Sequence, residues 1–206
     1  MSAEVEWVPK TKLGRMVLEG KIVSLDEIFA QGLRIQETEI VDRLMPNLRQ
    51  EVLSMSIVQK QTDAGEQSRF KVVVAVGNED GYIGVDSGKA KQIRGAIEKA
   101  TMYAKLNITP VRRGCGSWEC ACHQPHSLPF KTVGKCGSVR VELIPGPRGL
   151  GIVANETTAT ILRLSGIKDC WSRSFGSTKT TSSLAYAVYY ALRNTYKTVA
   201  PQDWTR

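Results

Sequence analysis

The stretch from Arg69 to Arg113 constrains the fold of this chain more than any other part of its sequence. Over residues 70–76, bulky apolar side chains recur at every second position, the pattern of a half-buried strand. A polar turn with a glycine at each end follows at residues 77–81, and residues 82–85 predict a short second strand, which we expect to end at Gly88. Beyond it, small and aliphatic residues recur at helical spacing: Ala90, Ile93, Ile97, Ala100 and Ala104. The sequence therefore predicts two strands that are joined by a tight turn and followed by an amphipathic helix.

The predicted helix has a basic face. Lys91, Arg94 and Lys105 fall on the side opposite the apolar residues. We expect the helix to begin beside Gly88 and Lys89, where free backbone N–H groups and the positive end of the helix dipole favour an anion. This arrangement predicts a surface that binds a phosphate backbone. The alternative is an ordinary solvated helix face.

The distribution of charge also favours a nucleic-acid partner. The formal net charge is +8, and residues 89–148 hold eleven Lys and Arg against three Asp and Glu, whereas residues 1–88 hold ten against fourteen. A basic segment of this kind marks binding to nucleic acid or to an anionic membrane. No segment approaches the ~20 apolar residues that span a bilayer, and the first ten residues lack the apolar centre of a signal peptide. We therefore expect a cytoplasmic protein with no membrane partner.

Four longer runs of sequence are far more specific than any short motif. They are VAVGNEDGYIGVDSGKAKQIRGAIEKA, RRGCGSW, GKCGSVRVELIPGPRGLGIVA and DCWSRSFGSTKTTSSLAYAVYYAL. Together they cover roughly residues 47–200, in an order and at a spacing that resemble the small-subunit ribosomal proteins of family five, in their archaeal and eukaryotic-type form. Near the N-terminus, WVPKTKLGRMV is similar to the N-terminal extension of that family.

Breaks in the pattern predict an α+β protein with two domains, each with its own apolar core. The expected parts are an N-terminal arm (1–46), a strand-strand-strand-helix domain (47–113), a Cys/His-rich connector (114–129), a β-α-β-α domain (130–200) and a tail (201–206). In the arm, a capping box over Ser24 to Glu27 opens a short helix. The resemblance implies that the first domain is similar to double-stranded-RNA-binding domains. It also implies that the second domain is of the type found as the second domain of ribosomal proteins of family five, with a left-handed β-α-β fold.

Two further segments are candidates for contact with RNA. The loop 145–151 is rich in Pro and Gly and lacks the GKS or GKT ending of a nucleotide-binding loop, so Arg148 at its tip is expected to meet an RNA phosphate. Residues 174–183 place hydroxyl groups and Lys179 before a helix, which favours an anion, although helix capping also explains the hydroxyls. The full set of expected RNA contacts is Lys89, Lys91, Arg94, Lys105, Arg112, Arg113, Lys131, Lys135, Arg140, Arg148, Arg173 and Lys179.

A metal site is predicted in the connector. Cys115, Cys120 and Cys122 lie within eight residues, and in a cytoplasmic protein such a cluster is more often a metal site than a set of disulfides. With His126 as the fourth ligand they would close a structural zinc site, because His123 adjoins a ligand and would have to fold back sharply. The spacing C-x4-C-x-C-x3-H lacks the paired CxxC motifs of a zinc ribbon, and the alternative is a group of reduced, buried thiols.

The other two cysteines have different expected roles. Cys136 is a spare candidate for the fourth ligand. Cys170 falls on a strand pattern, where we expect it to lie in the core.

A catalytic role is not expected. The deaminase signature of H-x-E followed by P-C-x-x-C is absent from the sequence. Glu119 lies between the predicted ligands, but a zinc ion with four protein ligands has no open position for a water molecule. Neither a nucleophile elbow nor a small-molecule substrate site is indicated.

The sequence thus favours a structural constituent of the small ribosomal subunit that binds ribosomal RNA. The resemblance implies a place near the path by which messenger RNA (mRNA) enters the subunit, beside small-subunit proteins four and eight, and a contribution to subunit assembly and decoding accuracy. The alternative is a free-standing double-stranded-RNA-binding protein acting off the ribosome. A second basic domain and an acidic arm favour permanent burial in an assembly over that alternative.

Overall fold

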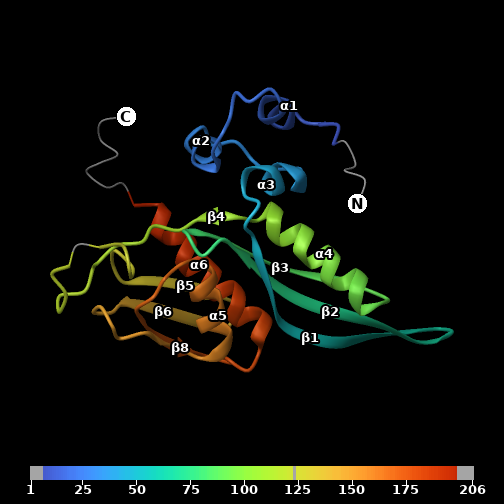
Figure 1. The fold of residues 1–206 in the computed structure, drawn as a ribbon. Helices are drawn as coiled ribbons and strands as arrows, with labels where there is room; N and C mark the ends of the chain where they lie inside the picture. Colours follow the sequence, from blue (N-terminus) through green and yellow to red (C-terminus); the bar gives the residue numbers. More distant parts are fainter. Residues whose placement is uncertain (1–6, 123, 199–206) are drawn as a thin grey trace. The chain divides into compact units, whose positions relative to one another are not determined.

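The computed structural model describes residues 7–122 and 124–198 (Figure 1). The chain forms two compact units, Met1–Leu48 and Arg49–Arg206.

The first unit contains three short helices, α1 (Lys12–Leu18), α2 (Leu25–Ala30) and α3 (Thr38–Leu44). The predicted cap is present in part: Ser24 Oγ accepts the backbone N–H of Glu27, whereas the Glu27 carboxylate accepts the N–H of Val23, the residue before the N-cap. The carboxylate of Glu37 also holds the segment before α1 in place. Glu37 accepts hydrogen bonds from the backbone of Lys10 and Thr11, at 2.9 and 2.6 Å, and from the indole of Trp7 at 3.0 Å.

The second unit begins with an antiparallel sheet in the order β1-β2-β3-β4. Its strands and helix are β1 (Arg49–Thr62), β2 (Gly65–Gly77), β3 (Tyr82–Ala90), β4 (Thr109–Pro110) and α4 (Ile93–Leu106). Helix α4 lies along one face of this sheet (Figure 1). It lies against the backbone of β3, since a Cβ atom on Gly88 would come within 2.5 Å of the carbonyl oxygen of Ala96.

The start of α4 differs from the prediction. Strand β3 continues through Gly88 to Ala90, and the helix begins at Ile93 with Gln92 as its N-cap. Gly88 is therefore a close-packing position within the strand, and it does not mark the beginning of the helix. Ile93, which was expected on the buried face, is 39% exposed.

A second sheet follows the connector, in the order β5-β6-β8-β7. Its elements are β5 (Thr132–Cys136), β6 (Val139–Pro145), β7 (Ile152–Val153), α5 (Glu156–Leu164), β8 (Cys170–Phe175) and α6 (Thr181–Tyr196). Strands β7 and β8 are parallel and α5 connects them, which is the predicted β-α-β unit. Asn155 caps α5 by accepting the N–H of Thr158 at 3.0 Å.

The two sheets share a cluster of buried residues, in addition to the buried residues that pack the first sheet against α4, so the predicted domains are joined by a common core. Residues 72–76 of β2 are all buried, so both faces of this strand are covered, and α4 contacts it together with α5. A single cluster of buried residues includes Val73 and Val85 from the first sheet and Val141 and Leu192 from the second sheet and α6. The turn 77–81 joins the same body, because the N–H of Glu79 donates to the carbonyl of Leu164 at 2.9 Å.

Candidate metal centre and nucleic-acid surface

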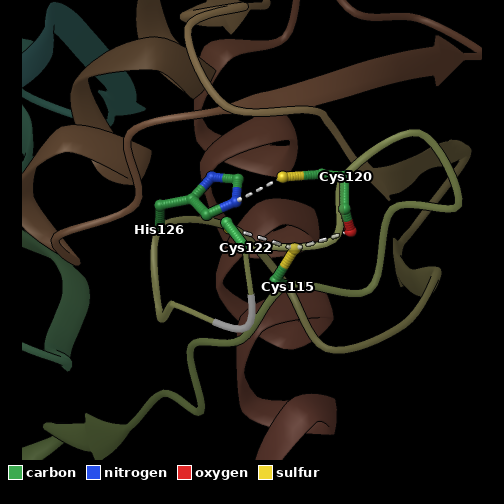
Figure 2. A group of neighbouring side chains, drawn as sticks. All are labelled: Cys115, Cys120, Cys122 and His126. Carbon is green, nitrogen blue, oxygen red and sulfur yellow. Dashed lines mark hydrogen bonds between the residues drawn. The ribbon is translucent and has the colours of Figure 1, made fainter.

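Three cysteines and one histidine of the connector face one another (Figure 2). The Sγ atom of Cys120 lies 3.8 Å from Nε2 of His126, and the Sγ atoms of Cys115 and Cys122 are 3.5 Å apart. One ligand atom from each of the four side chains lies within 4.8 Å of all the others. The structure therefore brings together the four residues that the sequence predicted.

A bridge between two short segments of the connector explains this proximity. Gly114 and Ser127 pair as an isolated antiparallel bridge, with reciprocal backbone hydrogen bonds of 2.8 and 2.9 Å. Cys115 directly follows one bridge residue and His126 directly precedes the other, so the pairing places both beside each other. The loop between them then returns Cys120 and Cys122 to the same point.

The arrangement fits tetrahedral zinc. Ligands at the usual Zn–S and Zn–N bond lengths are about 3.5–3.8 Å from one another across a tetrahedral ion; the two distances above lie in that range, and all six ligand-to-ligand distances are within 4.8 Å. Cys136 lies on β5 and does not belong to this group of ligand atoms among the residues that the structure describes. His123, the alternative histidine, lies outside the described residues.

The cysteines differ in their readiness to lose a proton. Hydrogen bonds from the backbone N–H groups of Arg148 and Cys122 stabilise a thiolate and lower the pKa of Cys120 to about 6. Burial instead raises the pKa of Cys115. Burial also raises the pKa of Cys170 to about 12, and this thiol is fully buried, as expected for a core residue.

A buried carboxylate orients the histidine. His126 Nδ1 lies 2.8 Å from Asp169 Oδ2, and the side chains are only 8% and 6% exposed. We assign the proton to Nδ1, because the carboxylate can only accept, and this assignment leaves the Nε2 lone pair facing Cys120. Such a carboxylate-histidine pair is the usual support of a histidine that binds a metal. The sequence analysis did not identify Asp169.

Most of the predicted RNA contacts lie on the surface. Nine of the twelve are exposed: Lys89, Lys91, Arg94, Lys131, Lys135, Arg140, Arg148, Arg173 and Lys179. Lys105, Arg112 and Arg113 are partly buried. The guanidinium of Arg112 lies over the ring of Tyr196, 5.6 Å from its centre, and Arg113 pairs with Asp80.

The outer face of the second sheet gathers several of these cations. Lys135 is opposite Arg140, and Arg173 is opposite Glu142. Glu142 accepts from both Lys131 and Arg140 at 2.8 Å, and the hydrogen bond from Lys131 is the main cause that lowers its pKa. The face therefore carries a net positive charge around one paired carboxylate.

Two hollows contain cations that the sequence analysis missed. A groove of about 320 Å³ on the β1-β2 hairpin places Lys60 and Arg69 beside Lys89. A cavity of about 600 Å³ places Arg163 and Lys168 beside Arg113. Lys89 and Arg113 are each distant in sequence from the other cations of their hollow, so the register of the strands and the docking of α5 bring them together.

The fold defines a class of RNA-binding protein. A three-stranded antiparallel meander with one helix across it is double-stranded-RNA-binding-like, and the second sheet with its β-α-β unit adds a second domain. No helix in the described part of the chain has the length and apolar character needed to cross a membrane.

Comparison with known families identifies this chain further. Residues 48–112 match the family described as "Ribosomal protein S5, N-terminal domain", and residues 134–204 match "Ribosomal protein S5, C-terminal domain". The chain is 61% identical over 199 residues to the "Small ribosomal subunit protein uS5" of Thermofilum pendens, covering 97% of this chain and 98% of that protein. It is 57% identical to the protein of the same name from Ignicoccus hospitalis, covering 100% and 97%. The chain belongs to the ribosomal protein S5 family, which confirms the resemblance predicted from its sequence.

Proposed function

We propose that this chain is a structural constituent of the small ribosomal subunit that binds ribosomal RNA through both of its domains. The observation that carries the proposal is the match of both domains to one ribosomal family, at about 60% identity to relatives named as small-subunit proteins. Exposed cations on both sheets supply the phosphate contacts that such a role requires. This role places the protein in the cytoplasm.

The finer role concerns position and partners. The protein lies near the path by which mRNA enters the subunit, contacts small-subunit proteins four and eight, and contributes to assembly and decoding accuracy. The shared core supports this role, because it makes the two sheets one rigid body that can clamp RNA elements on either side. The twelve predicted cations are its RNA contacts, and the functional divisions are the arm (1–46), the domains (47–113 and 130–200), the connector (114–129) and the tail (201–206).

A zinc ion bound by Cys115, Cys120, Cys122 and His126 is the second part of the proposal. The ion would act structurally, joining the two ends of the connector. The four-ligand set and the buried carboxylate behind His126 support it. A zinc ion with four protein ligands has no position for a reacting water molecule. This supports the proposal that the protein has no catalytic activity and no small-molecule substrate.

RNA selectivity tests this function against the alternative of a free-standing double-stranded-RNA-binding protein. The isolated protein is titrated with a transcript of small-subunit ribosomal RNA and with a random-sequence duplex of equal length at the same salt concentration. We expect the ribosomal transcript to bind more tightly, because its shape matches both domains. Equal affinity for the two RNAs would support the free-standing alternative.

A further inference from the structure

Asp169 connects the metal centre to the loop that carries Arg148. Its Oδ2 atom lies 2.8 Å from His126 Nδ1, and its Oδ1 atom accepts the backbone N–H groups of Gly149 and Gly151, at 3.1 and 2.8 Å. Both glycines have positive φ, 88° and 76°, a conformation that other residues rarely adopt. The loop is therefore shaped so that two of its N–H groups converge on the carboxylate that orients a metal ligand.

Two further connections join the same segments. Ser127 Oγ donates to the backbone carbonyl of Asp169 and accepts the N–H of Gly146 at 3.1 Å. At the other side of the loop, the backbone of Arg148 is the largest influence that lowers the pKa of Cys120, so this part of the loop lies near the thiol. The loop 145–151 is thus close to one proposed metal ligand, Cys120, and is attached to another, His126, through the carboxylate of Asp169.

Zinc bound at the centre would strengthen two of these connections, the one at Cys120 and the one through His126 and Asp169. A cysteine that binds zinc is a thiolate, and an anionic sulfur accepts an N–H bond more strongly than a thiol does. A histidine that binds zinc through Nε2 donates a more polarised Nδ1–H to its carboxylate, which fixes the carboxylate in place. A fixed carboxylate in turn holds the N–H groups of Gly149 and Gly151.

We propose that occupancy of the Cys/His centre sets the conformation of the loop 145–151 and so presents Arg148 to RNA, with Asp169 as the positioning residue between them. The inference rests on the zinc site and the Arg148 contact of the proposed function. The side chain of Arg148 is exposed, and Gly149, the next residue, donates its N–H to Asp169, so this end of the loop joins the centre to the outer surface.

The test measures RNA affinity and loop exchange with and without zinc. The full chain is stripped with a chelator, and half is reloaded with zinc chloride. Amide hydrogen exchange of residues 148–151 should slow about tenfold or more on reloading. With a transcript of small-subunit ribosomal RNA, Arg148→Ala should weaken binding in the loaded protein and have little further effect in the stripped protein.

Two variants make the test specific. Asp169→Asn keeps the size of the side chain but replaces one acceptor oxygen with a donor, so it should lower zinc affinity about 10- to 100-fold. At saturating zinc it should also abolish the slowing of loop exchange. Lys179→Ala is the matched control, because Lys179 is an exposed cation on a separate loop. Its effect on RNA affinity should be the same with and without zinc.

The possible outcomes distinguish a failure of the coupling from a failure of the zinc site or of RNA binding. Stoichiometric zinc with unchanged loop exchange overturns the coupling and leaves the zinc site intact. If zinc binds stoichiometrically but Arg148→Ala weakens RNA binding equally with and without the metal, the proposal that zinc presents Arg148 to RNA is overturned. Failure to bind zinc at all overturns both the zinc site and the coupling, while the binding of RNA by the other cations still stands.

Discussion

Nδ1 of His126 lies 2.8 Å from a carboxylate oxygen of Asp169, and both side chains are buried although 43 residues separate them in the sequence. This pair attaches the connector to the start of β8. The backbone reinforces it, since the N–H groups of Lys168 and Asp169 both donate to the carbonyl of His126, at 2.9 and 3.2 Å. The Cys/His group is therefore attached to the second domain through His126.

Zinc content is the first prediction. Protein purified without added metal should carry about one zinc ion per chain, because four convergent ligands form a closed site. Cys120→Ser and His126→Ala should lose the ion, whereas Cys136→Ser should retain it, since Cys136 is outside the group. Elemental analysis of the wild type and the three variants measures this. A wild type without stoichiometric metal, or loss of zinc in Cys136→Ser alone, contradicts the proposed ligand set.

Thiol reactivity is the second prediction. In the metal-free protein the thiolate of Cys120 predominates above its pKa of about 6, so alkylation by iodoacetamide should rise through pH 6 and level off near neutrality. Cys170, with a pKa of about 12 and no exposed surface, should remain unmodified in the folded protein. Peptide mass spectrometry after timed alkylation gives both rates. Added zinc should protect Cys120, and equal rates with and without zinc would count against its role as a ligand.

The third prediction concerns the salt dependence of RNA binding. Each phosphate contact releases counterions, so Lys89→Ala or Lys91→Ala should each reduce the slope of log affinity against log salt by roughly 0.7–0.9. Lys21→Ala is the control, because this exposed lysine is paired with Glu19 in the first unit. Fluorescence titrations over a range of salt concentrations measure the slopes. Slopes that match wild type for both Lys89 and Lys91 would make this surface an ordinary solvated face.

Arg148→Glu is the fourth prediction. The side chain is exposed, so the melting temperature should change little, while incorporation into small subunits should weaken through repulsion from phosphate. Thermal melts and reconstitution with ribosomal RNA give the two readouts. A large drop in melting temperature would show that Arg148 is mainly a structural residue.

The fifth prediction compares two glycines of the first domain. Gly88→Ala places a Cβ atom 2.5 Å from the carbonyl oxygen of Ala96, so α4 must move, and the free energy of unfolding should fall by about 1–3 kcal/mol. Gly95→Ala lies within α4, and its Cβ atom has ordinary space at 3.7 Å from Ala90. This second change should raise stability by roughly 0.5–1 kcal/mol. Denaturant unfolding of both variants checks the comparison, which fails if Gly88→Ala is neutral.

Local patterns predicted the elements that local physics determines. The alternation in residues 70–76 correctly indicated β2, and the cap at Ser24 correctly indicated α2. The proximity of the four Cys/His side chains was also predictable, because all four lie within a dozen residues and belong to the residue types that bind zinc.

Features that depend on distant parts of the chain were not predictable in this way. Asp169 is a single acidic residue with no neighbouring signal, and only folding places it behind His126. The shared core arises because β2 is covered on both faces, which its apolar run permits but does not specify. The beginning of α4 was placed too early because Gly88 was interpreted as a helix boundary, whereas it allows β3 to pass beneath the helix backbone.

Sedimentation of the ribosome tests the central claim most directly. The tagged chain is expressed in a related archaeon and the lysate is separated on a density gradient at high salt, which removes loosely bound RNA-binding proteins because their phosphate contacts are screened. Immunodetection across the fractions should place the chain with the small subunit in a constant ratio to its ribosomal RNA. Recovery of the chain only in the free fractions at the top of the gradient would contradict its role as a constituent of the small subunit.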